Sequence, residues 1–171
     1  EDNVRITPLT ENDAMGHPKL AGWVMTTPDG TEYRFEQTEQ TFFTDCPRAE
    51  SYSSAFYLTR IKTTAEAVVT FGYKTRDFHL ASFANIQDSR MEQYITTDMA
   101  YYKVPYLDRI SYPGGSISFE YATDRLDYSS EVRLSAVRIN DAAGNNLSKW
   151  ELIQGYFVSN ANTGLDVPTL D

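Results

Sequence analysis

The sequence predicts an all-β fold in which consecutive antiparallel β-hairpins form a meander, laid side by side as a long, twisted and partly rolled sheet. A β-sandwich is the alternative. Aromatic residues make up 13% of the chain, with 12 tyrosines and 9 phenylalanines, and such side chains fit the half-buried surface of a sheet. Two segments are near copies of each other. In each, a short polar or Gly/Pro break separates two apolar arms, which is typical of a hairpin.

The two copies predict the strongest hairpins, at residues 55–74 and 105–122. Their outgoing arms read Tyr-Leu-Thr-Arg-Ile (57–61) and Tyr-Leu-Asp-Arg-Ile (106–110). Their return arms read Val-Thr-Phe-Gly-Tyr and Ile-Ser-Phe-Glu-Tyr, so each ends in an aromatic pair. We expect each outgoing arm to pair with its own return arm.

The outgoing arms carry apolar residues three positions apart, and not two. The pairs are Leu58 and Ile61, Leu107 and Ile110, and Leu134 and Val137. Strict alternation along a strand would place the two members of each pair on opposite faces. The spacing therefore predicts a kink or a β-bulge near the start of each outgoing arm, which re-aims one side chain.

The N-terminal part is predicted to be organised only from Gly22 onward. Residues 1–21 are polar and irregular, and we interpret them as an N-terminal arm or a loosely attached strand. A weaker hairpin follows, with its turn at 28–30 (Pro-Asp-Gly), because Asp-Gly tolerates the positive φ of a tight turn. Residues 36–54 contain few apolar side chains and are predicted to be a surface loop.

The segment 75–104 is harder to assign because its apolar residues alternate imperfectly. We favour an irregular strand pair. The rival is a short helix over residues 89–99, which Asp88 or Ser89 could cap. Thr96 and Thr97 weaken this helix, since β-branched residues are poor helix formers.

The C-terminal part predicts one more hairpin and then a tail. Residues 133–139 form the outgoing strand, 141–146 the turn, and 147–157 the return strand. We therefore place a β-hairpin repeat domain at 22–157. Residues 158–171 are mostly polar, and we interpret them as a C-terminal tail or linker.

Charge and composition narrow the classes of partner. The chain has 15 basic and 24 acidic residues, a net charge of −9. This balance argues against nucleic acid, whose binding needs a basic surface. No apolar run is long enough for a transmembrane segment. The chain starts at Glu1, and we expect it to be a mature form or part of a longer protein.

The order of the motifs resembles that of the YD-repeat (Rhs-like) proteins of bacteria, in the region that flanks or precedes the regular repeats. The resemblance covers roughly residues 22–157. It is carried by Gly-Trp-x5-Asp-Gly-x2-Tyr-x-Phe from Gly22, by the two copies described above, by Arg-Leu-Asp from Arg125 followed by Arg133-Leu134, and by residues 140–145 ahead of Trp150. In typical YD units an Asp follows the last tyrosine of the return arm, where this chain has Lys74 and Ala122.

The resemblance implies a non-catalytic structural or interaction module of a secreted or surface-exposed bacterial protein. Its partners would be neighbouring domains of the same longer chain, and glycans or cell-surface proteins. The family's shells look like long spiralling β-sheets, some of which enclose a toxin. Nothing in this sequence matches a toxin core or its self-cleaving protease, so neither activity is expected.

Residue types with catalytic or metal-binding chemistry form no motif, and we predict neither an enzyme nor a cofactor. His17, His79 and the single Cys46 are far apart and lack metal-ligand spacing. Four carboxylates cluster around the second copy, but turns and solvated faces explain them: Asp108, Glu120, Asp124 and Asp127.

Exposed tyrosines give an alternative function, a carbohydrate-binding module in which aromatic rings stack on sugars. Tyr73 and Tyr121 occupy equivalent positions in the two copies, which favours a role in sheet packing. Tyr101, Tyr102 and Tyr128 lie outside the repeat pattern and are the candidate ligand-stacking residues.

Overall fold

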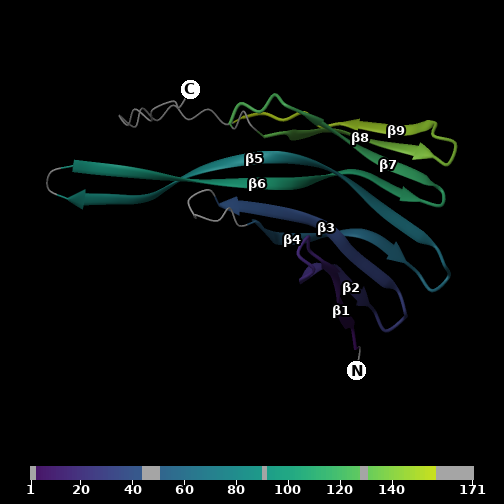
Figure 1. Cartoon of the computed structure of the whole chain (residues 1–171). Helices are drawn as coiled ribbons and strands as arrows, with labels where there is room; N and C mark the ends of the chain where they lie inside the picture. Colours follow the sequence, from purple (N-terminus) through teal and green to yellow (C-terminus); the bar gives the residue numbers. More distant parts are fainter. Residues whose placement is uncertain (1–2, 44–50, 90–91, 128–130, 157–171) are drawn as a thin grey trace.

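The computed structural model describes residues 3–43, 51–89, 92–127 and 131–156, and within this part the side chains of 43, 51 and 78–100 are left aside. The nine strands of these described residues belong to one antiparallel sheet, in which each strand pairs with the next along the chain (Figure 1). The strands are β1 (Arg5–Asn12), β2 (Pro18–Thr26), β3 (Glu32–Phe43), β4 (Ser51–Lys62), β5 (Val68–Ser89), β6 (Glu92–Tyr112), β7 (Gly115–Ala122), β8 (Arg133–Asp141) and β9 (Asn146–Glu151).

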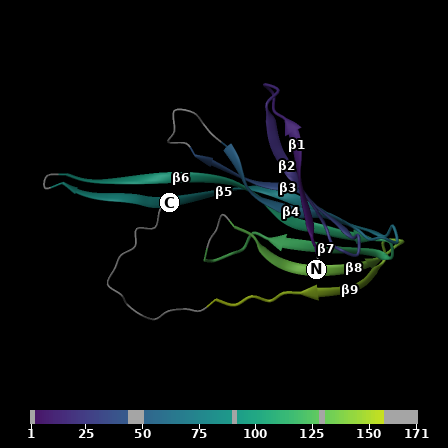
Figure 2. The same cartoon turned by 90° about the horizontal axis from the view of Figure 1, so that it is seen from below.

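This architecture confirms the predicted meander of hairpins, and the described residues form a single sheet and not the two sheets of a sandwich. The sheet is also partly rolled. Residues 40–43 at the end of β3 pair with residues 100–103 of β6, so that β3, β4, β5 and β6 close a ring of pairings. Beyond this ring, β5 and β6 continue as a long two-stranded arm, and β1 and β2 stand steeply against the other strands (Figure 2).

Bulges occur where the three-residue spacing predicted them. Pairing skips Thr59 in β4, Asp108 in β6 and Ser135 in β8, and each of these residues directly follows the leucine of the motif. A fourth bulge skips Ala21 in β2, which follows Leu20. Every even-numbered strand therefore carries a Leu-x bulge that faces the odd-numbered strand before it.

Hydroxyl groups in two of these bulges bond to the partner strand. Thr59 Oγ1 donates to the carbonyl of Arg34 at 3.1 Å, and Ser135 Oγ donates to the carbonyl of Glu120 at 3.0 Å. In both cases the acceptor belongs to the residue that pairs with the one after the bulge. The bulges of β4 and β8 therefore share the same side-chain hydrogen bond as well as the same register shift.

The turns between strands also repeat. Residues 13–17, 27–31, 63–67 and 141–145 share the same two backbone hydrogen bonds, from the first residue to the fifth and from the fourth to the first. The fourth residue has positive φ in each turn, and it is Gly16, Gly30, Glu66 and Gly144 respectively. Glycine adopts this conformation without a steric penalty, so Glu66 at φ 62° is the strained member of the set.

Several expectations need correction. Residues 36–54 are not a surface loop, because β3 runs to Phe43 and β4 starts at Ser51, with 44–50 outside the described residues. This stretch lacks apolar alternation, yet its backbone pairs with β4, and at 40–43 also with β6. The helix at 89–99 was wrong, since β6 begins at Glu92. The favoured strand pair is present as the extension of β5 and β6.

The N-terminal end differs from expectation, and the predicted C-terminal tail lies outside the described residues. Organised structure starts at Arg5 and not at Gly22, because β1 pairs with β2 from Arg5 to Asn12. The expected boundary at residue 21 therefore falls inside β2. The predicted tail, residues 158–171, lies outside the described residues.

The pairing register gives the sheet two chemically different faces, since residues directly opposite one another share a face. On one face, which we call the apolar face, a band of side chains crosses from β2 to β9. Its members are Trp23, Met25, Tyr33, Phe35, Leu58, Ile61, Val69, Phe71, Leu107, Ile110, Ile117, Phe119, Val137, Ile139 and Trp150. Ser148, opposite Ile139, is the polar exception in this band.

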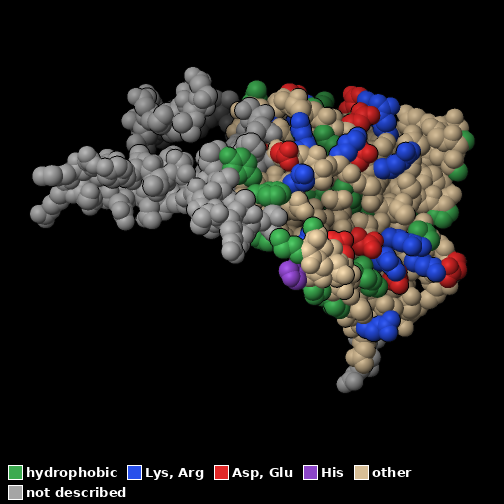
Figure 3. All heavy atoms as spheres, in the orientation of Figure 1, with side chains coloured by type: hydrophobic (Ala, Val, Ile, Leu, Met, Phe, Trp, Pro, Cys, Tyr) green, Lys and Arg blue, Asp and Glu red, His purple; other side chains and the backbone are tan. Residues whose placement is uncertain are grey.

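The other face, which we call the polar face, carries charges in alternating sign. Arg34 pairs with Glu32 at 2.7 Å, Arg138 with Glu120, and Lys149 with Glu151 at 2.6 Å. Figure 3 shows such basic and acidic groups side by side over the strands. Because these pairs are partly exposed, each stabilises the fold only slightly.

Almost no side chain is fully enclosed in this single layer. Among the described residues, the buried apolar side chains are those of Pro105, Val132 and Ala136. Thr31, Thr41 and Ser116 are buried polar residues. Ala136 lies on the polar face, opposite Glu120, whereas Pro105 shares the face of Leu107, two residues away. The side chains of the apolar band itself remain half-buried or exposed.

Candidate functional site

Two tyrosine pairs repeat the same geometry at equivalent places in the sheet. The first tyrosine pair, Tyr57 and Tyr73, has ring centroids 5.8 Å apart at an interplanar angle of 61°. The second tyrosine pair, Tyr106 and Tyr121, has values of 5.6 Å and 67°. Edge-to-face contacts at these distances are favourable because the positive ring edge meets the negative ring face.

Each pair lies where two neighbouring strands separate. The ladder between β4 and β5 ends with Arg60 opposite Thr70, and Tyr73 lies three residues further along β5. There the Tyr73 hydroxyl donates to the carbonyl of Leu58 at 2.7 Å. The phenol thus replaces the backbone N–H that would have continued the ladder.

The second pair repeats this arrangement between β6 and β7. The ladder ends with Arg109 opposite Ser118, and Tyr121 lies three residues later. Its hydroxyl donates to the carbonyl of Leu107 at 2.8 Å. Both acceptors are the leucines that precede a bulge, so the bulge and the tyrosine belong to one repeated unit.

The first tyrosine of each pair donates to a carboxylate. Tyr57 donates to Glu39 at 2.7 Å, and Tyr106 donates to Glu131 at 2.7 Å. Burial, followed by the adjacent negative carboxylate, raises the pKa of Tyr57 to about 12 and raises the pKa of Tyr106 as well. Burial also raises the pKa of Tyr73. These phenols remain protonated donors near neutral pH.

A hollow of about 780 Å³ opens beside the second pair, between the separating strands. Three tyrosines line it, Tyr73, Tyr106 and Tyr121, together with the charged residues Lys74, Arg76 and Glu120. Aromatic faces with cationic and hydroxyl groups can stack on and hydrogen-bond a sugar or other flat polar ligand. This hollow therefore has a chemistry that suits a small polar ligand.

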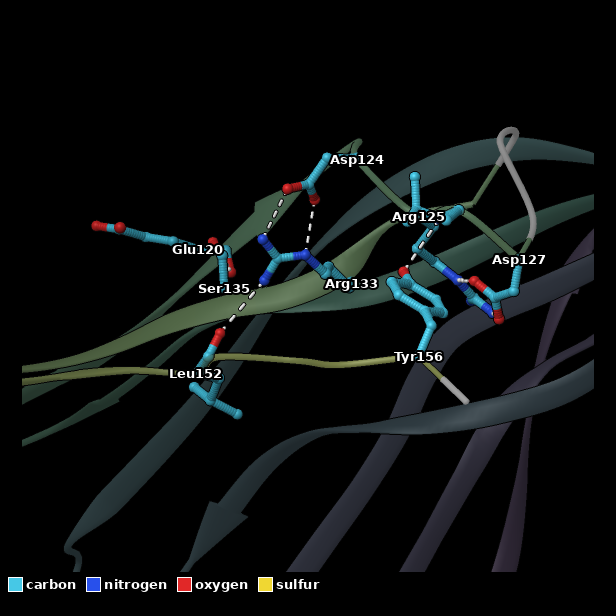
Figure 4. A network of polar contacts seen from close by, with 9 residues as sticks. Glu120, Asp124, Arg125, Asp127, Arg133, Ser135, Leu152 and Tyr156 are labelled. Atoms are coloured by element: carbon cyan, nitrogen blue, oxygen red, sulfur yellow. Dashed lines mark hydrogen bonds and ion pairs between the residues drawn. The ribbon is translucent and has the colours of Figure 1, made fainter. Parts of the chain in front are cut away.

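Next to this hollow, a polar network ties the segment before β8 to the chain after β9 (Figure 4). Arg133 donates to Asp124 at 2.6 and 2.7 Å and to the carbonyl of Leu152 at 3.3 Å. The backbone N–H of Leu126 donates to the Tyr156 hydroxyl at 3.1 Å. The network holds these segments in place, and its arginine and aspartate charges are matched within it.

The predicted ligand-stacking tyrosines do not come together in one platform. Tyr101 and Tyr102 are consecutive residues of β6, so they point to opposite faces of the strand. Both are half-buried, and their backbones pair with β3 and β5 on either side. Tyr128 lies outside the described residues.

The four carboxylates of the acidic cluster each meet a basic side chain. Lys74 contacts Asp108 at 2.6 Å, and Arg125 contacts Asp127 at 2.6 Å. Asp124 and Glu120 pair with Arg133 and Arg138. No group of three or more potential metal ligands gathers among the residues described.

Glu39 and Glu131 were missed by sequence reasoning. Glu39 lies 18 residues before its tyrosine, whereas Glu131 lies 25 residues after its own. The two carboxylates thus share no spacing that a sequence pattern could reveal. The tyrosines themselves were detectable, because Tyr57 and Tyr106 open the two copies.

No protein-family model, curated protein or solved structure matches this chain. Within the described ranges, no helix is long and apolar enough to cross a membrane.

Proposed function

We propose that the chain is a non-catalytic structural and interaction module of a secreted or surface-exposed bacterial protein of the YD-repeat-like kind. The observation that carries this proposal is the repeated unit. Within each hairpin, the leucine before the bulge accepts a hydrogen bond from a tyrosine on the return strand, first at Leu58 and Tyr73 and again at Leu107 and Tyr121. The backbone of the same tyrosine pairs with the next hairpin, Tyr73 with Leu107 and Tyr121 with Leu134, so the recurring unit serves to join hairpins edge to edge.

The use of polar groups supports a scaffold. The hydroxyls of the tyrosine pairs donate to backbone carbonyls or carboxylates within the sheet. In the polar network next to the hollow, Arg133 and Arg125 form ion pairs with Asp124 and Asp127. A site for catalysis instead needs groups that are free to meet a substrate.

The partners that this proposal implies are neighbouring domains of the same longer chain and proteins at the cell surface, whereas glycans are the partners that the alternative function implies. The outer edges of β1 and β9 are unpaired in the described sheet. Such edges are templates for pairing with another strand, and a neighbouring hairpin with the same Leu-x bulge would match their register.

The alternative function is carbohydrate binding. It is supported by the hollow lined by Tyr73, Tyr106 and Tyr121. Arg76 and Lys74 also line this hollow and could donate hydrogen bonds to sugar hydroxyls. This alternative uses a different set of tyrosines from Tyr101 and Tyr102, which lie on opposite faces of β6.

A glycan array probed with the purified chain separates the two functions. The scaffold proposal expects binding at background level for every glycan. Binding that disappears in Arg76→Ala, while Arg5→Ala on the distant strand β1 retains it, would establish carbohydrate recognition and overturn the scaffold as the principal role.

Surface location has its own test. Antibodies raised against the purified chain should label intact cells of the source organism, with no increase after permeabilisation. Labelling that requires permeabilisation would contradict the surface assignment and leave the glycan result unaffected.

A further inference from the structure

We propose that two copies of this chain join edge to edge at β9, as an antiparallel two-fold dimer. This inference names the partner of one of the two open edges of the sheet, and it rests on the scaffold function proposed above. β9 (Asn146–Glu151) is the last strand in the sheet order and forms its outer edge (Figure 2). An open edge is a template for a further strand.

Of the two open edges, β9 is the better template. Pro8 lies in the middle of β1 and lacks the N–H that an added strand would need, because prolines in sheets direct their nitrogen away from the neighbouring strand. β9 contains no proline. Half of the large apolar side chains that are exposed in the described residues lie between 147 and 156, namely Leu147, Trp150, Leu152, Ile153 and Tyr156. Such a concentration is typical of an interaction surface.

The backbone of β9 offers hydrogen bonds on its outer side. The N–H of Leu152 donates to the carbonyl of Ser135 at 2.8 Å, so this residue directs its amide inward, toward β8. The register is regular from Ser148 to Glu151. Because amide directions alternate along an antiparallel strand, Lys149 and Glu151 direct both N–H and C=O outward. An added strand can therefore pair with both residues.

The described part of the chain leaves this edge uncovered. After β9, the carbonyl of Leu152 accepts a hydrogen bond from Arg133 at 3.3 Å, and the Tyr156 hydroxyl accepts one from Leu126 N–H at 3.1 Å (Figure 4). These donors belong to β8 and to the segment before it, on the inner side of β9. Residues 152–156 are thus held on that side, and the outer side of β9 is open to a second chain.

Charge complementarity selects a second copy in one register. With the two-fold axis at Trp150, Lys149 lies opposite the partner's Glu151, and Glu151 lies opposite the partner's Lys149. On its inner side Lys149 lies opposite another cation, Arg138, so the partner's carboxylate offsets a like-charge contact. An axis at Lys149 or at Glu151 would instead place like charges opposite each other, which is unfavourable.

The same register matches the apolar side chains. Trp150, which is 53% exposed, meets its symmetry mate as a cross-strand aromatic pair on the apolar face. Leu147 is level with the partner's Ile153 at each end of the contact. Both copies use the same edge, so the contact is isologous and closes after two copies. The apolar face and the polar face each continue from one copy into the other.

Sedimentation equilibrium of the full 171-residue chain tests this inference. The expected mass approaches twice 19.4 kDa as the concentration rises through the micromolar range, as for a small interface. Glu151→Lys places like charges opposite each other and should raise the dissociation constant at least about tenfold, as should Lys149→Glu. The double variant Lys149→Glu/Glu151→Lys restores opposite charges and should return the dissociation constant to within about threefold of wild type.

Glu151→Pro tests the backbone contact. It removes an N–H that points outward and none that β8 uses, so the fold should remain while the dimer weakens at least about tenfold. The matched control for Glu151→Lys is Glu11→Lys on β1, at the opposite edge, which should leave the dissociation constant unchanged. Far-UV circular dichroism checks that each variant folds. If Glu151→Pro unfolds, the charge variants still decide the question.

Three results would overturn the dimer. The first is a monomer of 19.4 kDa that persists into the millimolar range. The second is a dimer that Glu151→Lys, or a folded Glu151→Pro, leaves intact. The third is a dimer that both single charge variants weaken and the double variant does not restore. Each of these would leave the scaffold function standing, because the glycan array and the surface labelling test that function separately.

Discussion

The two tyrosine pairs are built alike but obtain their carboxylates from different places. In both, the second tyrosine donates to the leucine carbonyl before a bulge. The carboxylate that binds the first tyrosine comes from β3 in one case, as Glu39, and from the segment just before β8 in the other, as Glu131. The register of the sheet fixes the leucine contact, whereas any carboxylate within reach can complete the pair.

The turns beside the two pairs differ as well. The hairpin of β4 and β5 closes with a five-residue turn in which Glu66 has φ 62°. The hairpin of β6 and β7 closes more tightly, with Tyr112 opposite Gly115. Gly115 then lies directly against β8, so its backbone cannot take a side chain. We therefore expect the turn of the first unit to tolerate substitution better than Gly115 in the second.

The largest expected effect comes from Gly115→Ala. A Cβ at this position would lie 2.1 Å from the carbonyl oxygen of Asn140, so β7 and β8 must move apart. We expect a loss of about 3 kcal/mol of unfolding free energy, or failure to fold. Urea unfolding measures it.

The control for this substitution is Gly144→Ala. Gly144 also has positive φ, at 87°, but nothing lies within 4 Å of a Cβ there. Its cost should be about 1 kcal/mol, the conformational term alone. Equal costs for the two variants would show that the contact between Gly115 and β8 is not tight.

The hydroxyls that donate to carboxylates should rank next. Tyr57→Phe removes the bond to Glu39 and Tyr106→Phe removes the bond to Glu131, each at 2.7 Å in the intact protein. We expect each to cost about 1.5 kcal/mol, since the acceptor is charged but partly exposed. If Glu39 and Glu131 are equivalent, the two variants lose the same unfolding free energy. A loss in only one variant would show that the two tyrosine pairs are not equivalent.

Alkaline pH should weaken the same contacts. The pKa of Tyr57 is raised in the folded state from 10.0 to about 12. Its contribution to stability is therefore fully present below pH 10 and is lost as pH rises through about 12. The urea midpoint of the wild type should fall over this window, and it should fall less steeply in Tyr57→Phe. Parallel curves for the two proteins would contradict the assignment.

The leucine contacts should follow with a smaller effect. Tyr73→Phe and Tyr121→Phe each remove a hydroxyl from a backbone carbonyl and keep the ring contact. We expect a loss of about 1 kcal/mol in each, typical of a neutral hydrogen bond. Thermal unfolding followed by tyrosine fluorescence measures both. A variant as stable as the wild type would show that its hydroxyl does not replace a ladder bond.

The smallest effect is a gain. Glu66→Gly relieves the positive φ of the turn and should stabilise the protein by about 0.5 kcal/mol, after the loss of the exposed ion pair with Lys62. Glu66→Gln is the control, because it removes the charge and keeps the strained backbone. A gain in Glu66→Gln as large as in Glu66→Gly would assign the effect to charge.

The meander and its bulges could be predicted because both produce a local sequence pattern: turn residues between apolar arms, and apolar residues three positions apart. Leu58 and Ile61 share a face only if a residue between them is skipped, and Thr59 is that residue. The paired strand at residues 36–43 has no such pattern. Residues such as Gln37 and Gln40 are polar, and backbone pairing along β3 does not require apolar alternation.

Pairing partners beyond the turn were not predictable either. Only residues 60–62 and 68–70 of the first copy pair with each other, and Tyr73 then pairs with Leu107 of the second copy. Nothing in the spacing of the first hairpin reveals this exchange of neighbours. The candidate stacking residues Tyr101 and Tyr102 were chosen because they lie outside the repeat, and being consecutive they lie on opposite faces.

Nuclear Overhauser contacts between backbone protons of an isotope-labelled chain test the edge-to-edge joining of hairpins most directly. The account predicts cross-strand contacts between Tyr73 and Leu107 and between Tyr121 and Leu134. Backbone contacts that instead place Tyr73 in a continuous ladder opposite residues 57–59 would contradict it, because the first hairpin would then be a closed ribbon with no tyrosine left to join its neighbour.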